Sequence, residues 1–290
     1  MLYLKKFTFP DGDTEFDKLL PILTKWHNSV YPFKILSKNF CEQLTFAPIT
    51  ILYGSNGSGK TTALNIIAEK LKLQRETLFN SSTYFSAYLS LCDYQLVTEE
   101  IPQNSAIITS DDVFDYMLNK RLVNNGIDRK REELITEYFA IKEEDQGQFR
   151  YREQEDLQKL EKLIAVRNNT LSMYVKKNLG LNLREKSNGE SALGYFTEKI
   201  TEDALYLLDE PENSLAPERQ LELAQFLEEA VRFYNCQLII ATHSPFLLAL
   251  RDAKLYDLDS CQVCCNNWQD LPNIRIYYDF FQKHREKFSN

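Results

Sequence analysis

The segment GSNGSGKT, residues 54–61, constrains the fold of this chain more than any other part of its sequence. It follows the apolar run ITILY at residues 49–53 and precedes an amphipathic segment, so a strand, a glycine-rich loop and a helix come in that order. Glycines permit backbone angles and close approaches that a Cβ atom would block. Successive N–H groups of such a loop, and the helix N-terminus behind it, attract an anion. This order of elements predicts a cradle for a phosphate chain.

Two side chains of the loop have expected partners. Lys60 should reach the β- and γ-phosphates of a nucleotide as a mobile point charge that faces solvent while the site is empty. The Thr61 hydroxyl should complete a magnesium shell. The residues expected to bind the nucleotide are Gly54, Ser55, Asn56, Gly57, Ser58, Gly59, Lys60, Thr61 and Thr62. We therefore predict that the chain binds a nucleoside triphosphate together with Mg²⁺.

Composition limits the class of protein. With 290 residues and 43% hydrophobic content, the chain can form one large domain or a domain with an inserted lobe. The net charge of −8 argues against a broadly basic nucleic-acid surface, although it is compatible with a local patch. No run of 18 uncharged apolar residues occurs, and the start of the chain lacks the apolar core of a signal peptide. We expect a cytoplasmic protein that has no membrane partner and binds nucleic acid only weakly on its own.

The six cysteines fit that compartment as free thiols. Cys261, Cys264 and Cys265 form a C-x-x-C-C cluster that suggests zinc. A closed structural zinc site requires four ligands, usually from two such pairs, and the sequence contains no second cluster. Buried or incidental cysteines are therefore the favoured interpretation.

The segments around the loop predict a strand-rich lobe. Residues 1–53 alternate short apolar runs with turn signals and include one helical stretch. Tyr31 or Phe33 could stack on an adenine base, but an aromatic residue beside a proline is more often packed in a core. After the helix that follows the loop, two further strands are predicted at residues 83–91 and 105–110.

Two acids, Asp111 and Asp112, follow the second of these strands. A polar side chain at such a strand end can touch the magnesium ion or the attacking water. Asp at the start of a helix is also a normal N-cap, and a helical segment follows here directly. Of the two interpretations the cap is favoured.

Residues 113–182 are charged and helical and contain no proline. They predict a lobe of two or three helices inserted between two parts of a nucleotide-binding core, residues 1–112 and 183–290. Arg129–Arg131 and the pair Lys176 and Lys177 could meet phosphates. Most of the charge in this lobe is expected to form a solvated face.

A second strand-and-acid pattern occurs at residues 204–212, ALYLLDEPE. The run that ends at Leu208 is continuously apolar, as in a strand buried on both faces of a parallel sheet. Ligands bind at the carboxyl ends of such strands. Asp209 should hold the magnesium through water, and Glu210 should act as a base for the attacking water, an effect worth roughly 10²–10⁴-fold.

The segment QLIIATHSPFLL repeats this architecture with a strand, a polar turn and a helix. His243 is the one of three histidines that stands at the carboxyl end of a predicted buried strand. It should contact the γ-phosphate and sense its loss, whereas a histidine satisfied within the core is the alternative. Pro245 fits the first turn of the helix that follows.

A further anion-binding turn precedes the strand that leads to Asp209. Ser187, Asn188, Gly189 and Glu190 open a predicted helix, which again places N–H groups around an anion. Two phosphate cradles for one catalytic pair make sense if the second cradle serves the nucleotide of a second copy of the chain.

Four segments in this order, GSNGSGKT, SNGES, LYLLDEPENSLAP and ATHSP, resemble the Walker A, signature, Walker B with D-loop, and H-loop motifs of ABC-type ATPases. The SLAP and THSP forms are similar to those of the SMC, RecF and OLD branch, above all to stand-alone bacterial ATPases. The resemblance implies an α/β P-loop fold with a mostly parallel sheet flanked by helices, and ATP hydrolysis. It also implies a head-to-tail dimer around two ATP molecules, in which Ser187 and Gly189 of one copy face the γ-phosphate held by the other.

The chain departs from that family pattern in several places. Glu190 stands where transporters usually have glutamine, and neither Gln95 nor Gln103 lies cleanly at the strand end expected for a Q-loop. The insert is far too short for the coiled coils of SMC proteins, and we do not expect a TOPRIM nuclease domain in the residues after 260. The tail is expected to form a final strand pair and a short helix that closes the core.

The motifs together favour an ATP-hydrolysing dimerisation module that acts in DNA maintenance or anti-phage defence beside a partner effector. A transporter's nucleotide-binding subunit is the first alternative, but it would need an LSGGQ signature and a Q-loop glutamine. The second alternative is an ATP-gated regulator with slow turnover that holds a toxin or nuclease inactive. Glu210 and His243 argue against it without excluding slow turnover.

Overall fold

The computed structural model describes residues 1–23, 30–39, 42–144, 156–178, 188–260, 264–265 and 267–288. The chain divides into two compact units, of which the first contains residues 1–114 and 188–290 and the second residues 115–187. The first unit carries the glycine-rich loop, the two acids after the second apolar run, and the histidine after the third.

A six-stranded sheet in the order β5-β6-β7-β3-β8-β9 forms the centre of the first unit. Its strands are β3 (Ile49–Tyr53), β5 (Ala106–Thr109), β6 (Leu205–Asp209), β7 (Gln237–Ala241), β8 (Lys254–Asp257) and β9 (Cys264–Cys265). Neighbouring strands from β5 to β8 are parallel, and β9 is antiparallel to β8. Every residue of β3, β6 and β7 is buried, as continuous apolar runs predict. The predicted α/β class is confirmed.

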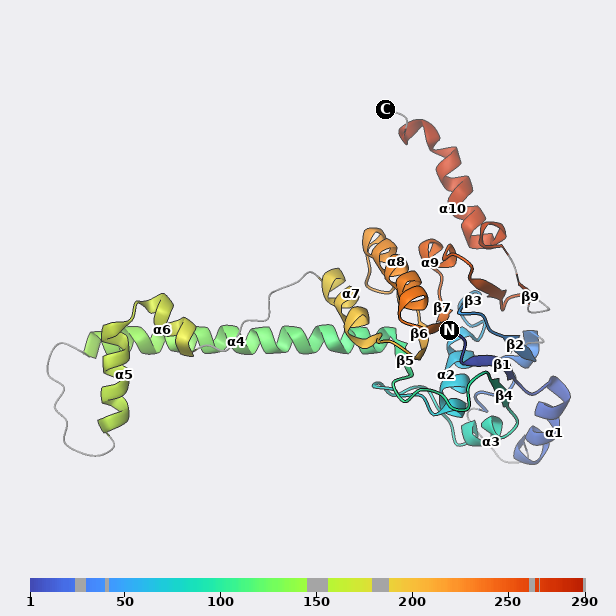
Figure 1. Ribbon diagram of the computed structural model, residues 1–290, viewed down its shortest axis with the longest axis horizontal. Coiled ribbons are helices and arrows are strands. Elements are labelled where there is room, and N and C mark those ends of the chain that lie inside the picture. Colours follow the sequence, from blue (N-terminus) through green and yellow to red (C-terminus); the bar gives the residue numbers. More distant parts are fainter. Residues whose placement is uncertain are drawn as a thin grey trace. The chain divides into compact units, whose positions relative to one another are not determined.

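Helices flank this sheet (Figure 1). In this unit they include α2 (Lys60–Leu71), α7 (Asn188–Lys199), α8 (Pro217–Phe233) and α9 (Pro245–Leu248). α2 packs on β5, β6 and β7, while α8 contacts β7, α7 and α9. Because the strands are parallel, the start of α2 and the ends of β6 and β7 share one edge of the sheet.

A second, antiparallel sheet of three strands carries the N-terminal segment, in the order β2-β1-β4. Its elements and the helices beside it are β1 (Leu4–Thr8), α1 (Gly12–Leu23), the 3₁₀ turn η1 (Ser37–Asn39), β2 (Gln43–Thr45) and β4 (Asp93–Leu96). The buried Gln237 amide joins the two sheets, because it accepts from the N–H groups of Tyr3 and Leu4 and donates to the Leu4 carbonyl. The strand-rich lobe and its early helix are as predicted.

The strand predicted at residues 83–91 is wrong, because this segment contains the short helix α3 (Phe85–Leu89). Phe85 and Tyr88 are its buried residues, and a spacing of three places both on one face of a helix. The aromatic content favoured a strand, but the packing of these rings against Tyr31 and Phe33 decides the helix.

The expected helix at the end of the chain, α10 (Pro272–Lys283), does not close the core. Leu271 and Ile274 are buried, whereas Ile276, Phe280 and Phe281 are each more than half exposed. The helix is held near its start, next to the 3₁₀ turn η2 (Trp268–Asp270), and a further 3₁₀ turn, η3 (Arg285–Phe288), follows it. Aromatic content alone did not reveal that only the first turn is packed.

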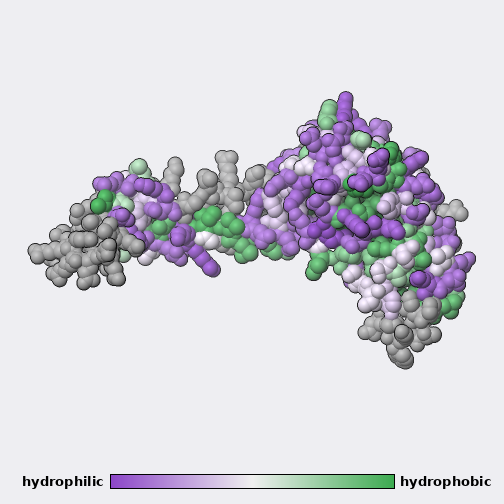
Figure 2. All heavy atoms as spheres, turned by 60° about the horizontal axis from the view of Figure 1, so that its bottom comes forward, coloured by the Kyte–Doolittle hydropathy of each residue, from purple (hydrophilic) through white to green (hydrophobic). Residues whose placement is uncertain are grey.

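Helices make up the described part of the second unit. α4 (Ser110–Glu144) starts in the first unit and continues into the second, which also contains α5 (Asp156–Asn168) and α6 (Leu171–Asn178). Leu134, Tyr138, Val166 and Tyr174 form a small buried cluster among them. On the face shown in Figure 2, hydrophilic residues alternate with small hydrophobic patches over this unit. The domain limits at residues 112 and 182 stay predictions. No described helix is long and apolar enough to cross a membrane.

Candidate nucleotide-binding site

The glycine-rich loop runs from the end of β3 to the start of α2, as its sequence predicts. A Cβ atom at Gly54 would lie 2.5 Å from Ser58 Oγ, so the loop folds back on itself only with glycine there. Gly59 has φ +99°, and a Cβ atom on it would lie 2.8 Å from Leu36. The two glycines therefore shape the cradle in which a phosphate chain can lie close to the backbone.

Lys60 lies inside this loop and is only 5% exposed. Its Nζ donates to the carbonyl oxygens of Gly54 (2.9 Å) and Ser55 (3.3 Å) and lies 2.7 Å from His243 Nε2. The expectation of a solvent-facing Lys60 is therefore wrong. The loop curls around the ammonium group so that its own carbonyl oxygens accept from it. Burial lowers the pKa of Lys60, and Glu210, Asp209, Asp259 and Glu212 offset part of that effect.

Thr61 and Asp209 meet at the edge of the sheet. Thr61 Oγ1 donates to Asp209 Oδ1 at 3.1 Å, and Asp209 is 8% exposed. Burial raises the pKa of Asp209 to about 6, because one hydroxyl compensates only part of the lost hydration. A buried carboxylate and a hydroxyl side by side are the oxygen ligands that a hard cation prefers, so these two residues fit Mg²⁺.

Glu210 and His243 face each other across the ends of β6 and β7. Glu210 Oε1 lies 3.7 Å from His243 Nε2, and both side chains are about one-third exposed. Glu210 has φ +48°, a left-handed conformation that is uncommon outside glycine and concentrates at functional sites. Burial, followed by the Lys60 cation, lowers the pKa of His243, so Nε2 of its neutral ring can accept a hydrogen bond from the Lys60 ammonium group.

A family model described as "AAA domain, putative AbiEii toxin, Type IV TA system" matches residues 68–249, well over half of the chain. The chain belongs to this family. The match includes Asp209, Glu210 and His243, and the glycine-rich loop lies just ahead of it. The match to an AAA domain agrees with the P-loop ATPase class that the sequence motifs predict.

Solved structures similar to this AAA domain include ABC and SMC proteins. The SMC head domain from Thermotoga maritima is 14% identical with a TM-score of 0.41, over 91% of this chain and 98% of that chain. The Smc head domain of Pyrococcus furiosus, solved with the C-terminal domain of ScpA, is 14% identical with a TM-score of 0.42, over 97% and 100%. A nucleotide-free ATP-binding cassette of an ABC transporter is 16% identical with a TM-score of 0.41, over 96% and 99%. A search of curated proteins found no match.

Some residues that line the candidate site of this AAA domain belong to no sequence motif. A cavity of about 300 Å³ beside the loop is lined by Ile35 and Lys38 together with Asn56, Gly57, Gly59, Lys60, Thr61, Thr62 and Glu210. Ile35 and Lys38 come from the segment before β2, and no sequence signal marks them. Phe33 is 2% exposed and packs edge-on against Tyr88, so the packing interpretation is right for it. Tyr31 lies 3.4 Å from Thr62 through its hydroxyl and does not line this cavity.

Asp259 holds the first turn of the loop from the segment after β8. Its Oδ1 accepts from the Ser55 hydroxyl at 2.8 Å, and its Oδ2 accepts from the Ser55 N–H. The sequence feature that could have revealed Asp259 is the acidic end of the run KLYDLD. This run begins with β8, which is the parallel neighbour of β3. Parallel neighbours end at the same edge of the sheet, so an acid just after β8 lies near the loop.

Asp112 supports the start of α4, as the favoured interpretation expects, but it lies at the third helical position and Thr109 is the N-cap. Its carboxylate accepts from the Thr109 N–H (2.6 Å), the Thr109 hydroxyl (2.9 Å) and the Thr77 N–H (3.0 Å). The Asp112 N–H donates in return to Thr109 Oγ1 at 3.4 Å, which completes a capping box. Asp111 is exposed beside it. Gln95 lies in the antiparallel sheet, and the carbonyl of Gln103 accepts from Gln74.

Some of the other predicted site residues lie outside the described residues. Ser187 is one of these, while Asn188, Gly189 and Glu190 form the first turn of α7, with side chains that are not described. Arg129–Arg131 lie on α4 and Lys176 and Lys177 on α6. Cys261 also falls outside the described residues, and Cys264 and Cys265 form β9. Within the described ranges, no three side chains of His, Cys, Asp or Glu gather into a metal cluster.

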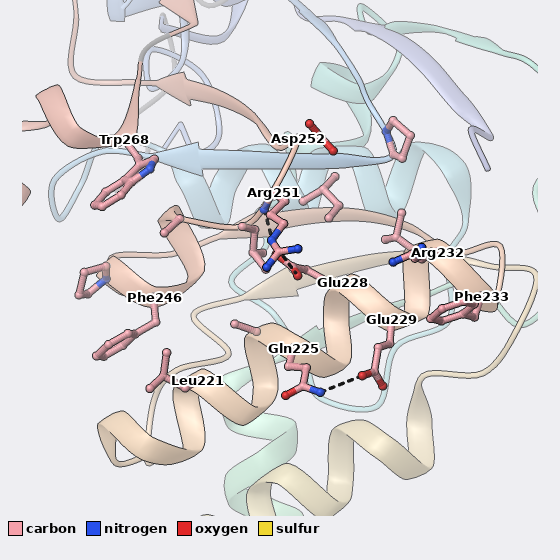
Figure 3. A pocket seen from close by; sticks show the side chains of 17 residues that line it. Leu221, Gln225, Glu228, Glu229, Arg232, Phe233, Phe246, Arg251, Asp252 and Trp268 are labelled. Carbon is pink, nitrogen blue, oxygen red and sulfur yellow. Dashed lines mark hydrogen bonds and ion pairs between the residues drawn. The ribbon is translucent and has the colours of Figure 1, made fainter.

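A larger groove of about 1100 Å³ lies between α8 and the segment from Pro245 to Asp252 (Figure 3). Leu221, Phe246 and Trp268 line it together with charged residues of α8. Neither the glycine-rich loop nor the acids at the end of β6 take part in it, so the groove is separate from the nucleotide site.

Proposed function

We propose that this AAA domain binds ATP with Mg²⁺ in the loop of residues 54–61 and hydrolyses it at the ends of β6 and β7. The arrangement of Lys60, Asp209, Glu210 and His243 carries the proposal. These side chains come from three separate segments at one edge of the sheet: Lys60 and Glu210 both lie within hydrogen-bond or ion-pair distance of His243, and Asp209 accepts from Thr61, the neighbour of Lys60. A purely structural glycine turn would not require this convergence.

Each side chain has a task in the proposed reaction. The loop N–H groups and Lys60 hold the phosphate chain, and Thr61 and Asp209 would hold Mg²⁺. The ion supplies charge stabilisation at the transferred phosphoryl group when it is bound. Glu210 stands in place to take the proton of the attacking water, and Asn213 fixes the second carboxylate oxygen through a 3.0 Å hydrogen bond. His243, 2.7 Å from Lys60, would contact the γ-phosphate.

A substitution in the loop tests nucleotide binding. Lys60→Ala should weaken ATP affinity by at least about tenfold, because it removes the cation that faces the phosphates. Lys72→Ala, at the exposed C-terminal end of α2, is the matched control and should bind as the wild type does. Equal ATP affinity of the Lys60→Ala protein and the wild type in isothermal titration would overturn the proposed site.

Hydrolysis is tested separately. Glu210→Gln keeps the shape of the side chain but removes the base, so phosphate release should fall by roughly 10²–10⁴-fold while ATP still binds. Slow phosphate release by the wild type itself would instead favour the alternative function of an ATP-gated regulator with slow turnover. A Glu210→Gln protein that releases phosphate at the wild-type rate would rule out Glu210 as the base.

We further propose that two copies close head to tail around two ATP molecules, with Ser187 and Gly189 of one copy facing the nucleotide of the other. The support is the order of the motifs and their resemblance to ABC-type ATPases. Glu210→Gln should then accumulate as an ATP-dependent dimer in light scattering, and Ser187→Arg should bind ATP without dimerising. A mixture of the two variants should recover part of the activity, because one of its two sites has neither defect. A monomeric Glu210→Gln protein in ATP would refute shared sites.

For the biological role we propose bacterial anti-phage defence or DNA maintenance together with an effector protein. The family description, which names a toxin of a type IV toxin–antitoxin system, supports the first of these. Co-purification of the Glu210→Gln protein from its native host tests the role. A nuclease or toxin that co-purifies in the presence of ATP would support an effector partner, whereas a co-purified membrane protein would point to a transporter.

A further inference from the structure

Glu212 connects two strand ends of the site, although no sequence motif assigned it a task. It lies in the turn between β6 and α8, and its Oε1 accepts from the backbone N–H of His243 at 2.7 Å and of Ser244 at 3.1 Å. Hydrogen bonds to an ionised acceptor are stronger than those between neutral groups. One side chain from the end of β6 therefore holds the backbone at the end of β7.

The position of the His243 ring depends on that backbone. Nε2 lies 2.7 Å from Lys60 Nζ and 3.7 Å from Glu210 Oε1, while the ring stands edge-on to Tyr53. The Ser244 hydroxyl donates to Gln220 and caps the first turn of α9, so the following residue is held from a second side. A rotation of the turn at His243 would move the imidazole away from both partners.

The second oxygen of Glu212 is difficult to explain by stability alone. Oε2 is buried and has no hydrogen-bond partner among the described residues. A buried carboxylate oxygen without a donor costs free energy, so an uncharged acceptor would be the more stable choice for a turn. The negative charge also lies close enough to affect Lys60 and His243, and it favours the charged form of each.

We propose that Glu212 is a positioning residue for His243, which it keeps between Lys60 and Glu210 by fixing the N–H groups of the turn after β7. The inference rests on the proposed ATPase function. Glu212 accepts no hydrogen bond from the loop of residues 54–61 among the described contacts, so its loss should affect turnover more than ATP binding. It acts through His243 and does not itself touch the nucleotide.

The protonation of His243 gives a readout that distinguishes positioning from a general effect on the fold. The charged groups that affect its titration are Lys60 on α2, Glu210 and Glu212 after β6, and Asp259 after β8, and the Tyr53 ring on β3 packs against it. Burial and Lys60 lower the pKa of His243 most, and the three carboxylates raise it less. Two substitutions of Glu212 should therefore move this pKa in opposite directions.

Glu212→Gln retains an acceptor for both N–H groups but removes the negative charge, so the pKa of His243 should fall further. Glu212→Ala releases the backbone, so the ring loses its burial and its contact with Lys60, and the pKa should rise toward its ordinary value. Histidine ring resonances of the full chain, titrated by NMR and assigned with His243→Gln, measure both shifts. Glu218→Gln, an exposed acid in the first turn of α8, is the control and should leave the resonance unchanged.

Steady-state kinetics provide the second measurement. Glu212→Ala should lower kcat by about 10–100-fold, as expected when a supporting side chain is lost, with KM for ATP changed by less than about threefold. Glu212→Gln should keep kcat within about threefold, because the positioning hydrogen bonds remain.

An unchanged His243 pKa in both variants would overturn the positioning role, and so would shifts in the same direction. If Glu212→Ala does not fold, the Glu212→Gln titration alone decides, since a pKa that does not fall contradicts the charge contact. Should the wild type hydrolyse no ATP, the proposed function fails while the titration still tests the link between Glu212 and His243.

Discussion

Two neighbouring strands of the large sheet end near acids whose carboxylates have different hydrogen-bond partners. β5 and β6 are parallel, with Thr109 paired to Asp209, and Asp112 follows the end of β5. Both carboxylates are buried, at 3% and 8% exposure. Asp112 accepts three hydrogen bonds from Thr77 and Thr109, whereas the one described donor to Asp209 is the Thr61 hydroxyl.

The difference shows how a buried carboxylate can be classified from its donors. When protein N–H and O–H groups replace the lost hydration, as at Asp112, the charge stabilises local structure, here the start of α4. When they do not, the pKa rises, as at Asp209, and the oxygen remains available to a cation. Position at a strand end alone does not make this distinction.

The largest expected effect follows from Asp209→Asn. The loss of one anionic magnesium ligand should lower ATP turnover by about 10³-fold, since metal stabilisation of the transferred group is worth several kcal/mol. Phosphate release at saturating Mg²⁺ measures it. A loss of less than tenfold would mean that the ion is held elsewhere and that the comparison with Asp112 is misleading.

The same substitution should stabilise the metal-free protein. The pKa of Asp209, about 6, exceeds its ordinary value of 3.8, so between these pH values the folded chain binds more protons than the unfolded one. Its contribution to stability is therefore lost as pH rises from about 4 to 6, by up to about 3 kcal/mol. Denaturant unfolding in EDTA should show this slope in the wild type and not in Asp209→Asn, which should be the more stable protein at pH 7.5. If stability fell with pH equally in both proteins, the raised pKa of Asp209 would not be the cause.

Asp112→Ala tests the other strand end and should give the opposite result. Removal of three hydrogen bonds to a buried carboxylate, including the capping box, should lower the free energy of unfolding by about 2 kcal/mol. Turnover per folded molecule should stay within about threefold of the wild type, because Asp112 is saturated by protein donors. Asp111→Asn, at the exposed neighbouring position, is the control and should change stability by less than about 0.5 kcal/mol. Loss of turnover without loss of stability in Asp112→Ala would indicate a catalytic role after all.

The smallest effect is expected at Thr77, whose hydroxyl lies 3.1 Å from the Thr109 hydroxyl. Thr77→Val removes that hydrogen bond and leaves the backbone N–H that donates to Asp112. Stability should fall by about 1 kcal/mol with unchanged turnover, as for a single neutral hydrogen bond. Thermal unfolding measures the change, and a loss as large as that of Asp112→Ala would show that the cap depends on Thr77 rather than on the carboxylate.

The sequence by itself determined the parts of the site that are local. Residues 54–61 lie between an apolar strand and a helix, and the acids and the histidine directly follow apolar runs. Such runs become buried strands of a parallel sheet whose ends meet at one edge, so the meeting of Lys60, Asp209, Glu210 and His243 could be predicted without coordinates.

Only the tertiary structure decided which partner each of these groups has. The burial of Lys60, the contacts of Glu212 and Asp259, and the place of Ile35 and Lys38 all depend on segments distant in the sequence. The helix at Phe85–Leu89 and the exposed face of α10 were also decided by packing. Periodicity reports which side chains are apolar, but the donors and neighbours that satisfy a buried group come from long-range contacts, which no local pattern encodes.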